Sequence, residues 1–484
     1  MLQAFKSLFR HGSIYSLGNM ISKLVGFLMI PLYTSYLKPV DYGVLELLTL
    51  VTSIVSMVLA LRITSGLTRF YRDYEDAGSR NSLVSTAIIF IIFLSIIAAL
   101  VFIHFSESIS LFVFQSADYQ YFFVLIFISL AFELAASVTF AYLQILEKSL
   151  FFISISLMQL TMGLTLNIYF LVVAQLGVAG ILYSMIISNG VTCILLLAYN
   201  FRMVRWGFDW GKLKQMISFS LPLIPAGMMI FVLNMGDRFL LNRLSSLEEV
   251  GVYALGYKFG MILGLLIGGP FNSIWGPKRV EIYNDQANRD EIFSRVFTYV
   301  TLVLAFAGLA ISILIKEILM VIAAPEYWEA YKVVPLVTLG YLFYIVYYIV
   351  DVGFYFQNKT SWYLIINATA AVSNVVLNLI LIPYYGAMGA ASVTAASFFL
   401  CPLIAYFVSQ HYYSLKYDFG RLGKLVLVTG ICYIVGSTIE TDSVAVNIIL
   451  KMSVIFSMPF LLYLIGFFEA RELGLLKAQL QRAV

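Results

Sequence analysis

The sequence predicts an all-α polytopic membrane protein with about fourteen transmembrane helices. Three observations lead to this prediction: an apolar composition, a series of apolar runs long enough to span a bilayer, and an internal repeat. The repeat indicates two six-helix lobes related by a pseudo-two-fold axis along the membrane normal, followed by two C-terminal helices.

The composition excludes a soluble protein. The chain has 484 residues, is 61% hydrophobic and 12% charged, and has a mean hydropathy of +0.92. Soluble domains carry about 25% charged residues. Lipid must therefore solvate much of this surface. A membrane barrel is excluded as well, because its strands alternate polar and apolar residues and these runs do not. The net charge of +4 gives no reason to expect nucleic acid as a partner.

The sequence shows no motif for metal binding, catalysis or nucleotide binding. Cys193, Cys401 and Cys432 lie singly in apolar runs, and the three histidines are far apart. A lone cysteine in such a run is typical of a core residue. We therefore predict no catalytic residue, no metal, no cofactor and no enzymatic activity.

The apolar runs define fourteen expected spans, each near the 20 residues that a helix needs to cross a bilayer. The spans are 12–37, 44–63, 84–104, 121–143, 150–174, 178–200, 216–243, 250–274, 293–316, 332–356, 361–383, 387–409, 424–439 and 446–468.

The basic residues orient these spans. With the N-terminus inside, 22 of the 30 Lys and Arg residues fall in inner segments and 5 in outer segments. Inner loops of membrane proteins carry this excess of positive charge. We therefore expect a cytoplasmic membrane protein of a bacterium or archaeon, with both termini in the cytoplasm.

The repeat has a period of about 210 residues. Its matched pairs are Lys148 and Lys359, Asn167 and Asn378, Gly177 and Gly386, Gly180 and Gly389, and Ser188 and Ser397. The copies are six spans apart, so both point the same way through the membrane. We expect an N-lobe at 1–210, a C-lobe at 211–415, and two additional helices with a cytoplasmic amphipathic tail at 416–484.

Three cations fall inside expected spans: Lys23, Arg238 and Lys258. A charge at membrane depth costs about 2.5–3.5 kcal/mol, so each of them requires a partner or a polar cavity. Lys23 lies near the midplane of the first span and is the leading candidate for contact with an anionic cargo. The alternatives are an acid partner for Lys23, a side chain of Lys258 that reaches the outer interface, and a structural ion pair for Arg238.

Three carboxylates, Asp237, Glu133 and Asp351, also fall inside spans and are candidates for coupling to an ion, H+ or Na+. The alternative for each is to be the partner of a buried cation. Because Asp237 and Arg238 are neighbours in a helix, we expect them to point apart and not to pair with each other. Arg69 and Lys278 occupy matching positions in the two halves. They are candidate substrate-binding cations, expected at a basic cytoplasmic rim that would raise the local concentration of a pyrophosphate-bearing lipid, although topology alone would also explain such a rim.

Glycine and proline interrupt the first span of each lobe. Gly18 and Pro31 lie in the first span, and Pro222 and Pro225 in the seventh. Interrupted segments at corresponding places of two repeats indicate hinges beside a cavity, although small residues also permit close helix packing.

Several segments resemble one transporter family. The segment at 12–48 is GSIYSLGNMISKLVGFLMIPLYTSYLKPVDYGVLELL, and TRFYRDYED follows at 68–76. A third segment, at 326–368, is EYWEAYKVVPLVTLGYLFYIVYYIVDVGFYFQNKTSWYLIINA. These segments resemble polysaccharide or O-antigen (Wzx-type) flippases, which belong to the multidrug/oligosaccharidyl-lipid/polysaccharide exporter superfamily.

The resemblance implies a carrier that works by alternating access. Its cargo would be an undecaprenyl-pyrophosphate-linked oligosaccharide, moved from the cytoplasmic to the outer leaflet. Implied partners are membrane lipids, a polysaccharide polymerase and glycosyltransferases. A drug or cation antiporter of the same superfamily is the alternative, and it would favour acids over cations in its cavity. A membrane glycosyltransferase or a scaffold fits less well, because no large outer loop carries clustered acids and the chain places charge at depth.

Overall fold

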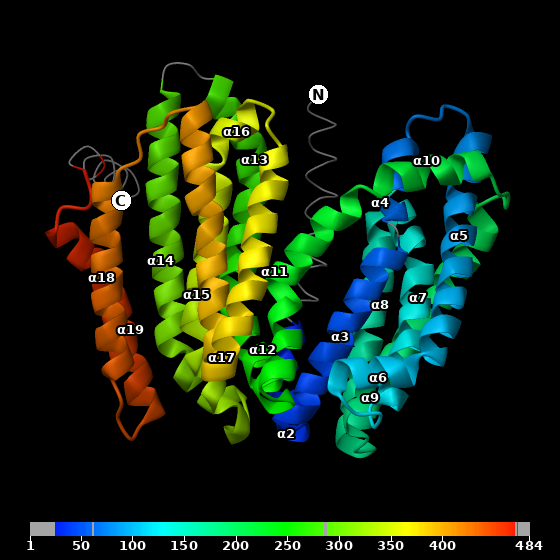
Figure 1. The fold of residues 1–484 in the computed structure, drawn as a ribbon, viewed down its shortest axis with the longest axis horizontal. Helices are drawn as coiled ribbons and strands as arrows, with labels where there is room; N and C mark the ends of the chain where they lie inside the picture. The colour runs from blue at the N-terminus through cyan, green and yellow to red at the C-terminus, as the bar shows by residue number, and fades with distance from the viewer. Residues whose placement is uncertain (1–24, 61, 285–287, 470–471, 473–484) are drawn as a thin grey trace. The chain divides into compact units, whose positions relative to one another are not determined.

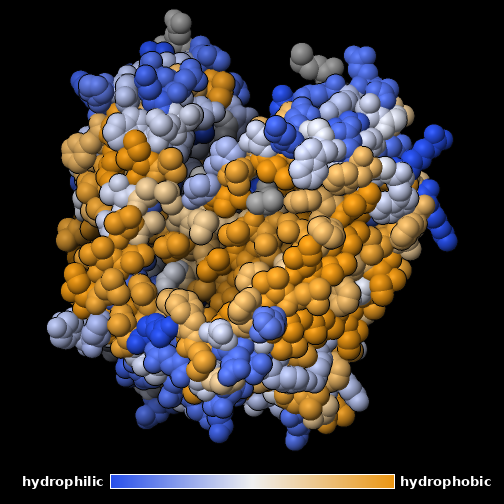
Figure 2. All heavy atoms as spheres, turned by 45° about the vertical axis from the view of Figure 1, so that its right-hand side comes forward, coloured by the Kyte–Doolittle hydropathy of each residue, from blue (hydrophilic) through white to orange (hydrophobic). Residues whose placement is uncertain are grey.

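The computed structural model describes residues 25–60, 62–284, 288–469 and 472. Over these ranges the chain is helical and contains no strand. Twelve of the described helices are long and apolar enough to cross a membrane, which confirms the predicted fold class. Figure 2 shows apolar side chains over the middle of the helices and hydrophilic side chains at their ends, as expected for a protein solvated by lipid in between.

The helices form two compact units, Met1–Gly251 and Val252–Val484. The first unit contains the following helices, the last of which continues into the second unit: α2 Ile30–Tyr36, α3 Pro39–Leu59, α4 Ile63–Phe70, α5 Ala77–His104, α6 Ser106–Phe114, α7 Gln120–Ile145, α8 Ser149–Ile168 with a π-helical end at Tyr169–Val173, α9 Gly177–Met203, α10 Trp210–Ser220, α11 Leu223–Leu244 and α12 Leu247–Gly260.

The second unit contains a π-helical segment at Gly264–Gly268, α13 Gly269–Asn284, α14 Arg289–Ile322, a 3-10 helix at Pro325–Lys332, α15 Val334–Val350, α16 Val352–Phe356, α17 Ser361–Tyr412, α18 Phe419–Thr438 and α19 Val444–Leu464. The lobe boundary expected at 210 stays a prediction. It separates the two copies of the sequence repeat, whereas the two compact units are defined by packing.

In the first unit, α5, α7, α8 and α9 lie side by side, and α10 crosses the ends of α4 and α5 (Figure 1). Aspartates begin two of these helices. The Asp76 carboxylate accepts a hydrogen bond from the backbone N–H of Ser79 at the start of α5, and Asp209 accepts one from Lys212 at the start of α10. Such caps satisfy N–H groups that have no partner within the helix. The expected seventh span is broken at Leu221 and Pro222 into α10 and α11, because Pro222 has no N–H to donate to the carbonyl four residues before it.

In the second unit, α18 and α19 pack against α14 through Leu309, Ile313, Val428, Ile455 and Met458. A buried ion pair joins the same helices: Lys451 Nζ lies 2.5 Å from Glu317 Oε1. This pair attaches the additional helix α19 to the rest of the unit.

The repeat reappears as matched turns. Gly177 and Gly386 have φ of +55° and +51°, and each lies where one span of a hairpin gives way to the next. Three residues later, a Cβ on Gly180 would lie 2.8 Å from Phe170 Cβ, and one on Gly389 would lie 2.7 Å from the Leu381 oxygen. Since Gly386 has non-helical angles, the 52-residue α17 contains both of the expected spans 361–383 and 387–409. The expected first span is represented by Val25–Tyr36, and its remainder lies outside the described residues.

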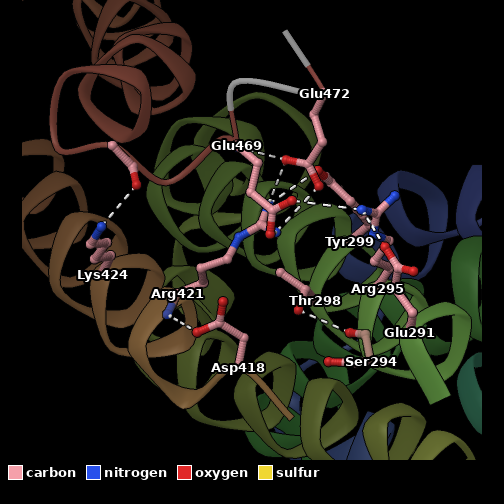
Figure 3. A network of polar contacts seen from close by, with 11 residues as sticks. Glu291, Ser294, Arg295, Thr298, Tyr299, Asp418, Arg421, Lys424, Glu469 and Glu472 are labelled. Carbon is pink, nitrogen blue, oxygen red and sulfur yellow. Dashed lines mark hydrogen bonds and ion pairs between the residues drawn. The ribbon is translucent and has the colours of Figure 1, made fainter. Parts of the chain in front are cut away.

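The C-terminal segment is held by a cluster of charges (Figure 3). The Arg421 guanidinium donates to Glu472 at 3.0 Å and to the Tyr299 hydroxyl at 3.1 Å, and its plane lies over the Phe467 ring. Arg295 contacts Glu291 at 2.6 Å and Glu469 at 3.6 Å. The expected amphipathic tail after Glu469 lies outside the described residues, apart from Glu472.

We predict that Gly389→Ala destabilises the protein by about 1–3 kcal/mol, because the new methyl group meets the fixed backbone oxygen of Leu381. The measurement is thermal unfolding of the full-length chain in detergent. Gly430→Ala is the control, since nothing lies within 4 Å of the added carbon. It should be neutral or slightly stabilising. Equal melting temperatures for the two variants would contradict the tight turn.

We predict that Glu472→Gln loosens the segment at 466–469. Burial raises the pKa of the Glu472 carboxyl, but hydrogen bonds from Tyr299, from the Glu469 backbone and from Arg421 outweigh burial and lower that pKa. The stabilisation is therefore complete above the usual Glu pKa and is lost as the pH falls through the lowered value. At pH 7, amide hydrogen exchange at 466–468 should accelerate about fivefold, which corresponds to a decrease of ~1 kcal/mol in the free energy of local opening. Glu326→Gln, an exposed glutamate elsewhere, should leave that exchange unchanged.

Candidate functional site

A polar cavity of about 810 Å³ lies inside the first unit, among α4, α7, α8 and α9. Ten of its fourteen lining residues carry polar side chains, in a bundle whose other faces are apolar. The polar residues are Thr64, Ser65, Thr68, Arg69, Glu133, Ser137, Gln144, Gln159, Asn189 and Thr192. Water and a polar ligand are therefore tolerated at this place within the membrane-spanning region.

A second cavity of about 470 Å³ adjoins the first and shares Phe140 and Gln159 with it. Its walls include Val25, Gly26 and Met29, beside the start of α2, and Tyr33. The Tyr33 hydroxyl accepts a hydrogen bond of 3.0 Å from the Asn167 amide. The cavities together join α2 to α7, α8 and α9.

Amides and hydroxyls dominate the chemistry of the larger cavity. The Gln159 amide donates to Asn189 Oδ1 at 2.7 Å, and the Asn189 amide donates to Ser129 Oγ at 2.9 Å. This chain of neutral groups fixes the amides while it leaves lone pairs and N–H groups toward the cavity. Such a wall can exchange hydrogen bonds with a hydroxyl-rich ligand without binding any one group strongly.

The cavity has one cationic and one anionic wall residue. Arg69 contacts Asp73 at 2.9 Å and lies over the Phe70 ring, with half of its side chain exposed. Glu133 extends from α7 into the cavity and forms no hydrogen bond or ion pair with any described residue. Of the residues predicted from sequence, the structure thus brings Arg69 and Glu133 to one cavity.

The other predicted cations lie elsewhere. Lys23 and Gly18 fall outside the described residues. Lys258 is half-buried in α12, within the second unit. Lys278 is exposed on α13, where it contacts Glu281 at 2.7 Å. Arg69 and Lys278 therefore share a position in the repeat and a local acid partner, and Arg69 lines the larger cavity.

Asp237 and Arg238 correct an expectation. We expected these helix neighbours to point apart, but Arg238 Nη1 lies 2.8 Å from Asp237 Oδ1, and both side chains are buried. The long arginine side chain folds back along α11, because a carboxylate is a better partner at this depth than hydrocarbon. Arg238 also reaches Glu46 of α3 at 3.8 Å, so it forms an ion pair between helices too.

Asp351 has a cation as its partner. Both of its oxygens accept from Arg279, at 2.9 and 3.0 Å, and the Tyr363 hydroxyl donates to it as well. The Arg279 guanidinium stacks on Tyr355 at 3.5 Å. This buried cluster joins α13, α15, α16 and α17 within the second unit. A role in ion coupling remains an expectation.

Two of the four expected hinge residues fall at helix breaks, and a third lies within one turn of a break. Pro31 follows an interruption at Met29, Pro222 separates α10 from α11, and Pro225 lies in the first turn of α11. Gln144, Gln159 and Asn189 were missed by the sequence analysis. Their signal is a neutral amide within an apolar run, but most such amides only join helices to one another, so the signal does not single out a cavity.

A family model described as "Polysaccharide biosynthesis protein" matches residues 35–332, which is more than half of the chain. No curated protein matches the sequence.

Among solved structures, the chain is similar to the lipid II flippase MurJ in an inward closed conformation, with a TM-score of 0.76 and 13% identity over 93% of this chain and 98% of the other. It is also similar to an inward-facing multidrug resistance transporter of the MATE family and MOP superfamily, with a TM-score of 0.60 and 14% identity over 81% and 97% of the two chains. An outward-facing MATE structure matches with a TM-score of 0.54 and 15% identity over 84% and 95%. At such identities these likenesses establish the fold.

We predict that the cavity is wet. Ser137→Cys should react with a charged, membrane-impermeant thiol reagent, because the thiolate forms only in water. Ile194→Cys, on an exposed apolar face of α9, should react at least tenfold more slowly. No native cysteine needs removal, since Cys193, Cys401 and Cys432 are all buried. Equal rates for the two variants would exclude a water-filled cavity.

Proposed function

Because the chain belongs to the polysaccharide biosynthesis protein family, we propose that it is a flippase for a polyprenyl-pyrophosphate-linked oligosaccharide. The cargo would move from the cytoplasmic to the outer leaflet of the cytoplasmic membrane by alternating access. The observation that carries the proposal is the cavity of about 810 Å³ with ten polar wall residues inside an apolar bundle.

The cargo sets the physical problem. A sugar headgroup loses many hydrogen bonds to water in hydrocarbon, and a pyrophosphate loses far more solvation energy. A wall of amides and hydroxyls replaces the hydrogen bonds of the sugar, while the polyprenyl tail stays in the lipid. The neutral character of most of the wall suits a headgroup that has to be released again, since a carrier must not hold its cargo too tightly.

Arg69 is the group proposed to contact the pyrophosphate. It lies on the cavity wall, and about half of its side chain is exposed. A guanidinium can bind phosphate oxygens through two parallel hydrogen bonds, so an arriving phosphate would compete with Asp73 for it. Lys23 and Lys258, which the sequence predicts for the same contact, remain additional candidates.

Glu133 favours the second candidate function, a drug or cation antiporter. A carboxylate in a wet cavity, with no partner among the described residues, can bind a proton, Na+ or an organic cation. In the flippase, the same carboxylate would serve as the site of ion coupling. Lipid II flippases and multidrug transporters share this fold, so the cargo has to be decided by measurement.

The test uses purified protein in vesicles that carry the lipid-linked oligosaccharide, with a membrane-impermeant glycosidase as the reporter of leaflet. We expect the wild-type chain to expose cargo from the inner leaflet, and Arg69→Gln to reduce the initial rate about tenfold through loss of a charged hydrogen bond. Arg72→Gln, three residues away and outside the cavity lining, should stay within twofold.

One outcome would count against the flippase, and another would count against the role of Arg69. Transport of an organic cation that depends on Glu133, without movement of the oligosaccharide, would assign the chain to the antiporters. Equal losses in Arg69→Gln and Arg72→Gln would remove Arg69 from the site and leave only general surface charge.

A further inference from the structure

A basic and aromatic surface lies outside the cavity, where α9 passes into α10. Five large apolar side chains are exposed between residues 201 and 210, and Phe201 and Trp210 are each 70% exposed. The five are Phe201, Met203, Trp206, Phe208 and Trp210. We call residues 201–214 the interfacial segment.

Three exposed cations, Arg202, Arg205 and Lys214, lie in the same segment. None of the three forms an ion pair with a described residue. Most other cations of the described chain have a carboxylate nearby, as Arg69, Lys278, Arg279 and Arg421 do. The acid of the segment, Asp209, is used locally, because it caps α10 and lies 4.0 Å from Lys212. The segment therefore presents positive charge without a partner beside exposed aromatic rings.

The backbone of the segment is fixed. The Gly207 oxygen accepts from Ser85 Oγ at 2.5 Å, and the Asp209 N–H donates to Thr86 Oγ1 at 3.0 Å. Both partners are buried in α5. Lys212 Nζ donates to the Ser79 oxygen at 3.0 Å. The exposed rings are thus held outward on a rigid support and do not belong to a loose loop.

Aromatic rings at the boundary between lipid and water and cations without acid partners are the two features that bind an anionic bilayer surface. We propose that the interfacial segment binds the headgroups of anionic phospholipids, and that α10 transmits their binding to the cavity. The rings would lie among the headgroups, and Arg202, Arg205 and Lys214 would contact lipid phosphates.

The connection to the cavity is direct. Phe219, nine residues after Trp210 and so about 14 Å along the helix, lines the cavity and packs edge-on against Phe70 of α4 at 5.5 Å. Nearer the middle of α10, a Cβ on Gly66 of α4 would lie 2.9 Å from Met216 Cα, so the two backbones touch. At its other end, α10 is separated from α11 by the break at Pro222. A shift of α10 would therefore move α4 and the cavity wall together.

The first experiment measures lipid selectivity through tryptophan fluorescence of the full-length protein in vesicles. Brominated phosphatidylglycerol should quench the emission of Trp206 and Trp210 more than brominated phosphatidylcholine does, and Trp210→Phe identifies the share of Trp210. The variant Arg202→Gln/Arg205→Gln/Lys214→Gln should lose this preference, with lipid affinity falling about fivefold for each charge removed.

The matched control is Arg72→Gln/Lys359→Gln/Lys416→Gln, which removes three exposed cations that lie outside the segment. It should keep the preference for phosphatidylglycerol. An equal loss in the control would show that only net charge matters and would overturn the proposal. A competition measurement adds either a polyprenyl pyrophosphate or unbrominated phosphatidylglycerol. Protection of the tryptophans from quenching by the pyrophosphate alone would assign the segment to the cargo and would also overturn the proposal.

The second experiment measures the connection to the cavity through the alkylation rate of Ser137→Cys. Addition of phosphatidylglycerol should change that rate at least threefold, and the change should vanish in the triple variant of the segment. A rate that does not depend on the lipid would refute transmission through α10. Neither readout contains the oligosaccharide, so either can fail while the proposed function stands.

Discussion

Hydrocarbon solvates neither charge nor free hydrogen-bonding groups, and this constraint explains the contacts of the charges buried in the described part of the chain. The buried charges obey it by pairing. Lys451 meets Glu317, Arg279 meets Asp351, and Arg238 meets both Asp237 and Glu46. All of these contacts except Arg238–Asp237, which lies within α11, join different helices, so the same contacts that neutralise charge also connect the bundle. Asp237 contributes to this connection through Arg238, which contacts both Asp237 and Glu46.

In the first unit, ten polar side chains outside these buried ion pairs line a cavity. Gln159, Asn189 and Ser129 form a neutral chain, and Glu133 and Arg69 are the charged members of the wall that it supports. A site built mostly from amides and hydroxyls can exchange hydrogen bonds with sugars at little cost. Strong ionic contacts would slow release, which a carrier has to avoid. The distribution of charge therefore separates the residues that hold the protein together from those available to a cargo.

Some positions of the sequence repeat have the same structure in both halves, and others make different contacts. Gly177 and Gly386 have nearly the same φ, and Gly180 and Gly389 both sit where a side chain would collide with the preceding span. The chain thus places a glycine of positive φ, followed three residues later by a second glycine at a close approach, in the turn of both hairpins. Other repeated positions diverge, since Asn167 donates to Tyr33 beside a cavity and Asn378 donates to Asn374 within its own helix. Matched residues of the two halves can therefore form different hydrogen bonds although the halves share one helical plan.

The sequence by itself determined the fold class, because apolar runs of bilayer length and a repeat six spans apart leave few other architectures. It also identified Glu133 as a charge at membrane depth that needed an explanation, and Arg69 as a member of a basic cytoplasmic rim. Only the tertiary structure decided which charges pair and which face water. The partners of Arg238 and Lys451 lie on other helices, and Gln159 and Asn189 become a cavity wall only when α8 packs beside α9. These distinctions depend on the rotation of each helix about its axis, which hydropathy leaves open when all faces are nearly equally apolar.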